Sequence, residues 1–287
     1  MKIIECPRDA MQGIDEFIVT DQKIRYINQL LKVGFDTIDF GSFVSAKAIP
    51  QMRDTKEVLA GLDLSTTKSK LLAIVANTRG AEEAVQHQAI DYLGFPLSIS
   101  ETFQQRNTNK SITEALNTLS EIQRICELAG KQQVVYISMG FGNPYNDPYS
   151  VTLVEKFVDI LNTLGVKIIS LADTIGISTP GQIKYLFETL SEKFRDVELG
   201  AHLHSTPQTA EEKIKAAFEA GCKRFDGAIK GFGGCPMAKD DLTGNLATES
   251  ILAYLKAQGV NTGLNEAEFA KAMVMADEIF PKSSIGH

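Results

Sequence analysis

Short apolar runs alternate with longer amphipathic stretches along the chain, and the alternation occurs eight times. The short runs are rich in β-branched residues, which is typical of strands, whereas the longer stretches repeat apolar residues at helical spacing. The predicted strands are Lys2–Cys6, Thr37–Ser42, Lys70–Asn77, Asp91–Ile99, Gln133–Met139, Lys167–Asp173, Glu198–His204 and Arg224–Ile229. The predicted helices cover about 21–34, 54–62, 79–88, 110–130, 148–164, 179–194, 208–220 and 246–258.

The strand patterns indicate a parallel sheet that is covered on both faces. Residues 71–75 and 134–137 are continuously apolar, whereas an exposed antiparallel sheet would alternate polar and apolar residues. We therefore predict an α/β protein, a single (β/α)8 (TIM) barrel that spans 1–287 as one catalytic domain. An additional C-terminal helix at about 265–280 is expected to pack on the barrel. A doubly wound open sheet uses the same alternation, but no Gly-x-Gly-x-x-Gly follows the first strand.

The charge distribution narrows the class of partner. The formal net charge is −7, and the lysines and arginines are spread along the chain, which argues against a nucleic acid or an anionic membrane surface. No apolar run approaches the ~20 residues of a membrane span, and no targeting segment opens the chain, so a cytoplasmic location is expected. Four cysteines at no repeating spacing indicate free thiols.

Polar residues gather where the predicted strands end. In a (β/α)8 barrel the reactive groups project from the C-terminal ends of the strands, so this pattern predicts an enzyme with its site at that mouth. The residues at these ends include Arg8, Asp9, Asp39, Ser42, Asn77, Ser98, Ser100, Ser138, Asp173, Thr174, His202, His204 and Lys230. Among the residues at or near these ends, Gln12, Ser42, Asn77 and Thr174 are expected to bind substrate.

The pair His202-x-His204 is the strongest single signal. Residues two apart on a strand point the same way, so both imidazoles can face one metal ion. The alternative is a pair of core histidines satisfied by hydrogen bonds. No third histidine lies at a strand end, so carboxylate and amide oxygens must complete a metal shell, and Asp9 is the nearest carboxylate once the barrel closes. A mixed nitrogen and oxygen shell suits Mg²⁺ or Mn²⁺.

Two further residues have both a structural and a chemical interpretation. Asp173 ends an apolar run, so its carboxylate either caps the following turn or takes part in the chemistry. Cys235 follows a glycine-rich segment, 231–234, whose backbone can approach a ligand closely and move. If that loop closes over a substrate, it brings the thiol of Cys235 to the site; otherwise the thiol is unreactive.

Several motifs in order carry a resemblance to a known family. They are Cys6-Pro7-Arg8-Asp9-Ala10-Met11-Gln12, Ser42-Phe43-Val44-Ser45-Ala46-Lys47, Ala172-Asp173-Thr174-Ile175-Gly176, His202-Leu203-His204, Gly231-Phe232-Gly233-Gly234-Cys235-Pro236 and Gly244-Asn245-Leu246-Ala247-Thr248-Glu249. The chain resembles the 3-hydroxy-3-methylglutaryl-CoA lyases almost from end to end. These metallolyases share the (β/α)8 barrel, so the resemblance implies the same fold.

The resemblance implies roles for particular residues. Asp9, His202, His204 and Asn245 would hold the divalent metal ion, and Arg8 would bind the thioester carbonyl of an acyl-CoA substrate. The implied reaction is a retro-Claisen cleavage to acetyl-CoA and acetoacetate, in a chain expected to form a homodimer. The other catalytic residues implied are Asp39, Asp173, His202 and Cys235, with Cys235 as the proton donor and His202 or Asp173 as the base. Leucine degradation and ketone-body formation both use this step.

Some residues depart from the family pattern and leave alternatives open. Asp39 stands where the family usually has glutamate, while Leu203, Ser205 and Asn143 also differ. Condensing relatives such as isopropylmalate, homocitrate or citramalate synthases form the bond that a lyase breaks, and a lyase could act on a related 3-hydroxyacyl thioester. A catalytically silent barrel that binds metal or a CoA ester is the non-enzymatic alternative.

Overall fold

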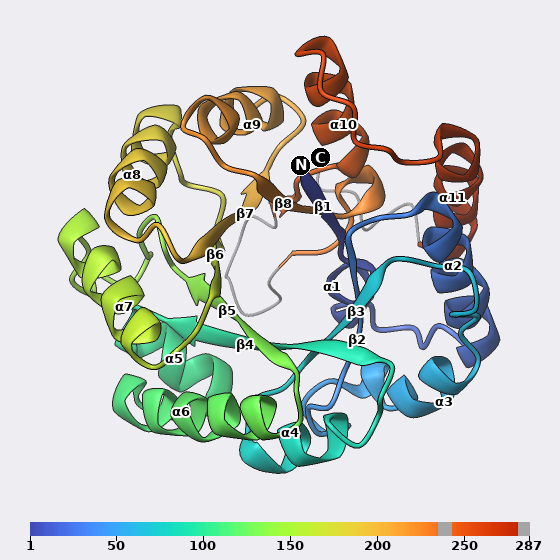
Figure 1. The fold of residues 1–287 in the computed structure, drawn as a ribbon, viewed down its shortest axis with the longest axis horizontal. Helices are drawn as coiled ribbons and strands as arrows, with labels where there is room; N and C mark the ends of the chain where they lie inside the picture. The colour runs from blue at the N-terminus through green and yellow to red at the C-terminus, as the bar shows by residue number, and fades with distance from the viewer. Residues whose placement is uncertain (235–242, 281–287) are drawn as a thin grey trace.

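Eight parallel strands close a barrel in the computed structural model, which describes residues 1–234 and 243–280 (Figure 1). Each strand pairs with the next in sequence, and β1 pairs with β8, so the described sheet leaves no free edge in the barrel. This closure confirms the predicted barrel and excludes the doubly wound open sheet. The strands are β1 Lys2–Glu5, β2 Thr37–Ser42, β3 Lys70–Ile74, β4 Ile90–Ser98, β5 Gln132–Ser138, β6 Ile168–Asp173, β7 Glu198–Ser205 and β8 Arg224–Gly227.

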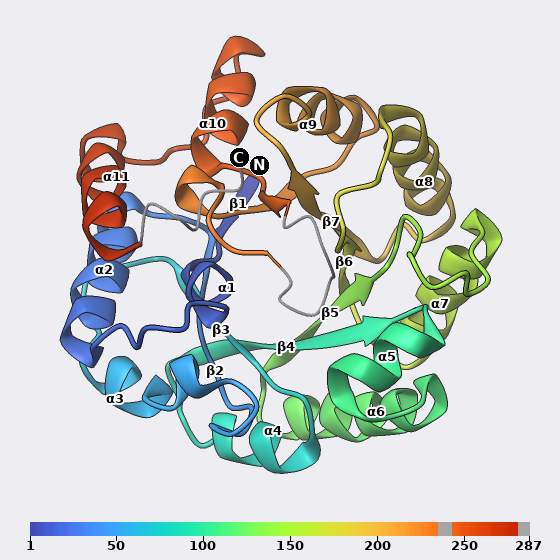
Figure 2. The same cartoon turned by 180° about the vertical axis from the view of Figure 1, so that it is seen from behind.

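Helices surround the barrel, as Figure 1 and the reverse view in Figure 2 show. The predicted helices are all present within a few residues of their expected bounds. Across the described residues, none of the helices combines the length and the apolarity that a membrane span needs. The helices that follow the strands are α2 Thr20–Val33, α3 Thr55–Ala60, α4 Thr78–Ala84, α6 Ile112–Leu128, α7 Val151–Thr163, α8 Pro180–Lys193, α9 Ala210–Glu219 and α10 Thr248–Ala257.

Short elements that the sequence pattern did not predict lie at the C-terminal mouth of the barrel. Because Pro7 cannot donate to a strand ladder, β1 stops at Glu5 and the helix α1, Pro7–Gln12, begins. Helix α5, Glu101–Thr108, was missed because it has little amphipathic periodicity. Strand β9, Gly244–Asn245, runs antiparallel to β7. The remaining short elements are the 3-10 helices η1, Pro50–Met52, and η2, Ile229–Gly231.

The expected C-terminal helix is α11, Glu266–Ile279, and it packs on the outer helix α2. The amide of Gln29 in α2 donates to the backbone oxygen of Glu268 at 2.9 Å. An aromatic contact joins Tyr26 of α2 edge-on to Phe280, with ring centroids 5.8 Å apart. These contacts attach the helix to the outside of the barrel, and its C-terminal end reaches the segment after β8, where Phe280 stacks on Phe232 with ring centroids 4.5 Å apart.

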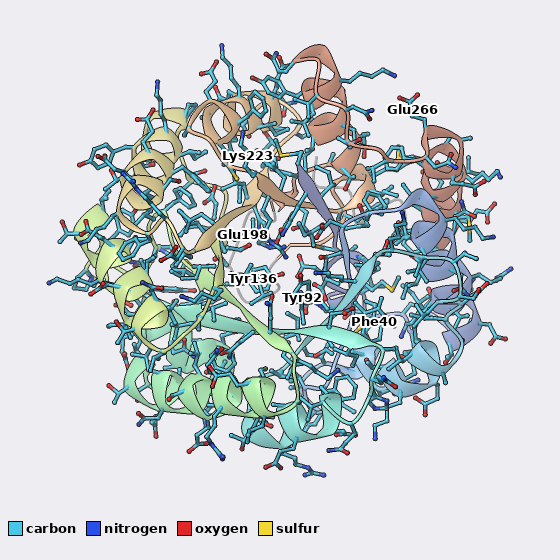
Figure 3. All side chains as sticks on the ribbon, viewed as in Figure 1. Phe40, Tyr92, Tyr136, Glu198, Lys223 and Glu266 are labelled. Carbon is cyan, nitrogen blue, oxygen red and sulfur yellow. The ribbon has the colours of Figure 1, made fainter. Side chains whose placement is uncertain are left out.

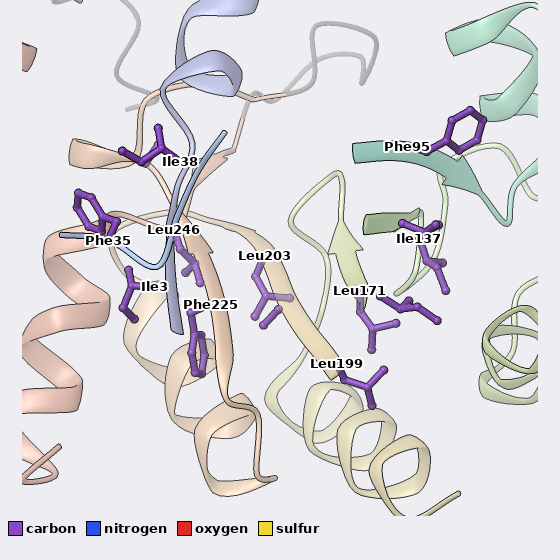
Figure 4. Packing of buried hydrophobic residues seen from close by; sticks show 14 of the residues in the cluster. Ile3, Phe35, Ile38, Phe95, Ile137, Leu171, Leu199, Leu203, Phe225 and Leu246 are labelled. Carbon is purple, nitrogen blue, oxygen red and sulfur yellow. The ribbon is translucent and has the colours of Figure 1, made fainter. Parts of the chain in front are cut away.

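Alternate residues of each strand face the barrel interior and the helices. On β3, Leu71 and Ala73 join the core between strands and helices, whereas Leu72 and Ile74 belong to a smaller cluster that fills the interior. Figure 4 shows several residues of the larger core, among them Leu199 and Phe225. The interior apolar cluster draws on β3 to β6, whereas β7 and β8 contribute buried polar residues such as His204, Arg224 and Asp226.

A buried carboxyl group joins β1 to η2 and α10, the elements that follow the last strand of the barrel. Glu5 is 1% exposed, and its oxygens accept hydrogen bonds from the backbone nitrogen of Ile229 at 2.9 Å and the hydroxyl of Thr248 at 2.6 Å. Burial raises the pKa of Glu5 from 4.5 to about 8, although these two hydrogen bonds act in the opposite direction. The folded chain therefore keeps this carboxyl protonated at a pH where the unfolded chain ionises it.

Substituting Glu5→Gln is expected to flatten the pH dependence of stability. Between pH 4.5 and about 8 the unfolded state binds fewer protons than the folded state, so the native chain loses stability as pH rises; glutamine, which mimics the protonated form, avoids this loss. The free energy of unfolding of Glu5→Gln, relative to that of the native chain, should rise by the order of 5 kcal/mol between pH 4.5 and about 8 and then level off. Urea unfolding of both chains across this range measures it. A pH-independent difference would contradict the prediction.

Candidate active site

Two histidines on β7 face a cavity at the C-terminal mouth of the barrel. His202 and His204 are two residues apart on the strand, their ring centroids are 5.5 Å apart, and both line a cavity of about 270 Å³. His204 is 3% exposed, and its buried Nδ1 atom has no hydrogen-bond partner among the described residues. The geometry therefore departs from a pair of core histidines that are both satisfied by hydrogen bonds.

The carboxylate of Asp9 completes a three-residue group with these rings. One potential ligand atom from each of Asp9, His202 and His204 lies within 4.8 Å of the others. The sequence pattern had placed Asp9 at the end of the first strand. In the structure it lies on α1 instead, because the chain turns into a helix at Pro7. The first turn of that helix carries the carboxylate over the mouth of the barrel.

Asn245 reaches the same group from β9. Asn245 is the register partner of His204 in the antiparallel pairing of β9 with β7. Its side-chain amide donates to Asp9 Oδ2 at 2.7 Å and to the backbone oxygen of Phe232 at 2.9 Å. Gly233, with a φ of +92°, makes this approach possible, because a Cβ atom there would lie 2.8 Å from the Asn245 amide nitrogen and from the Asp9 backbone oxygen. The four residues expected to surround a metal ion are thus neighbours.

The ionisation states of Asp9 and His204 suit a divalent cation. Burial, and then the charge of His202, lower the pKa of His204 to about 4, so its imidazole is neutral near neutral pH and can donate a lone pair. Burial alone would raise the pKa of Asp9, but Arg8 and the two histidines lower it below its usual value. An ionised carboxylate and an unpartnered buried imidazole nitrogen are donors that fit a metal ion with mixed nitrogen and oxygen ligands.

Arg8 is held by two carboxylates at the edge of the cavity. Its Nε and Nη2 atoms donate to Asp39 Oδ2 at 3.0 and 2.5 Å, and its Nη1 atom donates to Asp9 at 2.9 Å and to Gln12 at 2.8 Å. Burial raises the pKa of Asp39 to about 6, against the attraction of Arg8. In this structure the carboxylate of Asp39 orients the guanidinium and is not among the residues that line the cavity.

The carboxylate of Asp173 is already occupied by four donors. It accepts hydrogen bonds from the backbone nitrogens of Ile177 at 2.9 Å and Ser178 at 3.0 Å, from the Ser178 hydroxyl at 2.5 Å and from Lys213 Nζ at 2.8 Å. The same ammonium donates to the backbone oxygen of His204 at 2.8 Å. Of the two interpretations of Asp173, these contacts favour the structural one, in which it fixes the turn after β6 next to the site.

The other predicted substrate-binding residues divide between two hollows. Gln12 and Thr174 line the cavity with the histidines. Ser42 and Asn77 instead line a neighbouring hollow of about 380 Å³, and Asn77 is the N-cap of α4 because β3 ends earlier than predicted. The predicted catalytic residue Cys235 lies outside the described residues.

Two polar residues at the site were missed by the sequence reasoning. Tyr136 lines the cavity, and its hydroxyl is buried without a partner among the described residues; it had been read as part of an apolar strand run. Asp226 lies two positions into β8 and its Oδ2 atom is 3.2 Å from His202 Nδ1. The sequence did offer one indication of Asp226, because a carboxylate inside a predicted barrel strand is unusual.

Fold and site together define a barrel enzyme with a candidate metal centre at its C-terminal mouth. Comparison with family models identifies the family of this enzyme. Residues 2–275 match the model described as HMGL-like, so the chain belongs to the HMGL-like family. Among curated proteins, it is 34% identical over 272 residues to the hydroxymethylglutaryl-CoA lyase YngG of Bacillus subtilis, covering 95% of this chain and 90% of that protein. It is 35% identical to the cytoplasmic 3-hydroxy-3-methylglutaryl-CoA lyase of Rattus norvegicus, covering 92% and 77%.

Solved structures agree with this assignment. The crystal structure of the Bacillus subtilis HMG-CoA lyase matches with a TM-score of 0.90 at 33% identity, covering 96% of this chain and 92% of that one. An HMG-CoA lyase from Acinetobacter baumannii, in complex with coenzyme A and 3-methylmalate, matches with a TM-score of 0.90 at 31% identity, covering 97% and 90%. The resemblance read from the motifs is therefore confirmed.

Proposed function

We propose that this chain is a carbon–carbon lyase that cleaves 3-hydroxy-3-methylglutaryl-CoA to acetyl-CoA and acetoacetate. The observation that carries the proposal is the meeting of Asp9, His202, His204 and Asn245 beside Arg8 at one cavity, in a chain of the HMGL-like family. The relatives with more than 30% identity reported above are named as lyases, which favours cleavage over the condensation catalysed by synthases.

The proposed cofactor is Mg²⁺ or Mn²⁺, held by Asp9, His202, His204 and Asn245. The ionised carboxylate and the neutral imidazole of His204 support it, as does the amide of Asn245, whose oxygen is the atom left for a ligand once its nitrogen donates to Asp9. A bound cation supplies Lewis acidity, which lowers the pKa of a contacting hydroxyl and so eases removal of its proton.

Arg8 is proposed to bind the thioester carbonyl of the substrate. Negative charge collects on this oxygen as the carbon–carbon bond breaks, and a donor already aimed at it costs no reorganisation at that moment. Asp39 holds the guanidinium through two of its nitrogens, so the arginine is oriented before the substrate arrives. The shorter aspartate in place of the family glutamate is thus compatible with an orienting role.

Proton transfer completes the proposed reaction. The candidate bases are His202 and Asp173: His202 lines the cavity but is also a proposed ligand of the cation, whereas the Asp173 carboxylate does not line the cavity and already accepts four hydrogen bonds. The thiol of Cys235 is proposed to protonate the enolate carbon of the acetyl product, since an ordinary thiol has a pKa of about 8.5, near the operating pH.

The acyl-CoA substrate class has separate support. One matched HMG-CoA lyase structure contains coenzyme A together with 3-methylmalate, a small dicarboxylic acid. The cavity here combines apolar residues such as Val44 and Ile49 with the hydroxyls of Ser138 and Thr174, a lining that suits a short branched acid. The homodimer and the cytoplasmic location stay predictions.

A panel of acyl thioesters, assayed with and without a chelator, tests the proposed function. We expect acetoacetate to form from 3-hydroxy-3-methylglutaryl-CoA with Mg²⁺ or Mn²⁺ present, and the rate to fall to background with the chelator and to return when metal is restored. Turnover of a related 3-hydroxyacyl thioester alone would change the substrate and leave the reaction class. Synthesis from acetyl-CoA and a 2-oxo acid, without cleavage, would make the chain a condensing enzyme.

A further inference from the structure

Charged residues occupy the barrel interior on the side where the apolar filling is missing. The interior cluster of β3 to β6 includes Tyr92 and Tyr136, and Figure 3 shows both near the centre of the ring together with Glu198 of β7. Arg224 and Asp226 of β8 are each 0 to 1% exposed. Burying charges in a barrel core is costly, because each ion loses its hydration, so their arrangement calls for an explanation.

These residues form one row of alternating charge that ends at His202. Lys2 Nζ donates to Glu198 at 2.6 Å, and Arg224 Nη1 donates to the other oxygen of Glu198 at 3.2 Å. Arg224 Nε lies 3.9 Å from Asp226 Oδ1, and Asp226 Oδ2 lies 3.2 Å from His202 Nδ1. The row runs from the partly exposed Lys2 at the N-terminal end of the barrel to the cavity at its opposite end.

A glycine on β7 leaves the space that the side chain of Arg224 occupies. Gly200 of β7 is the register partner of Arg224, and a Cβ atom at Gly200 would lie 2.9 Å from Arg224 Cδ and 2.4 Å from the Ser170 hydroxyl. Any larger residue there would displace the arginine that faces Asp226. The same strand carries His202 two residues later, so the backbone that makes room for the row also carries the ring at its end.

We infer that Asp226 is a positioning residue that holds the proton of His202 on Nδ1 and thereby leaves the lone pair of Nε2 for a cation bound beside Asp9 and His204. A carboxylate can only accept a hydrogen bond, so its partner nitrogen must be the protonated one. Histidines that bind metals usually have their second nitrogen bonded in this way, which sets both the tautomer and the ring orientation. Arg224, whose Nε atom lies 3.9 Å from Asp226 Oδ1, places a counter-charge beside this carboxylate. This inference rests on the proposed metal site.

The first test measures the tautomer in the native chain without metal. Nitrogen NMR of ¹⁵N-histidine-labelled protein, with the His202 signal assigned by its loss in His202→Gln, should show the proton on Nδ1. In Asp226→Asn the amide can donate to Nδ1, and the Nε2-protonated form should then dominate. A native ring protonated on Nε2 would overturn the inference, whether or not any variant folds.

The second test measures Mn²⁺ affinity by calorimetry. Loss of an outer hydrogen-bond partner typically weakens metal binding roughly 10- to 100-fold, and we expect that loss in Asp226→Asn. Asp54→Asn is the matched control: it also breaks a buried ion pair, with Lys23 at 2.7 Å, but this pair joins α2 to the N-cap of α3 and includes none of the proposed metal ligands. Its Mn²⁺ affinity should equal that of the native chain.

The outcomes separate this inference from the proposed function. Native affinity in Asp226→Asn would overturn the positioning role, as would an equal loss in Asp54→Asn, because the drop would then report general loss of stability. If the native chain itself binds no Mn²⁺, the proposed metal site fails, and the tautomer measurement still decides what Asp226 does to His202.

Discussion

Asp9→Asn is expected to remove nearly all lyase activity together with the metal affinity of the site. The substitution takes away the one carboxylate in the group with His202 and His204, and it places an amide nitrogen among the donors of Arg8 and Asn245. If the cation contributes about 4 kcal/mol to lowering the barrier, kcat/KM should fall roughly 10³-fold.

The metal-stripped native chain is the control for this variant. Its residual rate should match that of Asp9→Asn, because both lack the cation. Added Mn²⁺ at about 100 times its Kd should stabilise the native chain by about 2.7 kcal/mol but leave the unfolding midpoint of the variant unchanged. A variant that is stabilised by Mn²⁺ as much as the native chain would show that Asp9 is not a ligand.

Arg8→Gln is expected to lower kcat by about 10²- to 10³-fold, the usual result of removing one donor to an oxygen that gains charge. It should also destabilise the fold by about 3–5 kcal/mol, because Asp39 is 1% exposed and would lose its buried counter-charge. Steady-state kinetics and chemical denaturation measure the two effects separately.

A double variant separates the catalytic loss from the structural one. Arg8→Gln with Asp39→Asn removes both charges of the Arg8–Asp39 pair and should recover part of the lost stability, since Asp39 no longer leaves an uncompensated buried carboxylate, whereas Asp9 still lacks its contact with Arg8. Its kcat should stay as low as that of the single variant. Recovery of kcat along with stability would mean that Arg8 supports the fold and has no direct part in the reaction.

Local patterns predicted the barrel well because its rules are local and repeated. Each strand needs a short apolar run and each helix an amphipathic stretch, so eight repeats of both identify the fold without any contact being known. The same holds for His202 and His204, whose common orientation follows from the two-residue period of a strand. Helix α5 was missed because its residues have too little periodicity to be recognised.

The roles of several polar residues depended on contacts that only the folded chain makes. Nothing in the pattern around Asp173 separates a catalytic carboxylate from a turn cap; the difference is made by Lys213, forty residues away, whose ammonium reaches it from α9. Likewise Asn77 has the position of a strand-end residue along the chain, yet β3 ends early and the side chain caps α4.

The sequence by itself determined the eightfold alternation and the residue types that can bind a cation, because periodicity and ligand chemistry are properties of short segments. Only the tertiary structure decided that Asp9 leaves its strand on a helical turn, that Asn245 meets it from β9, and that Asp226 lies behind His202. Barrel closure brings β8 beside both β1 and β7, so contacts between distant residues set which atoms face the cavity.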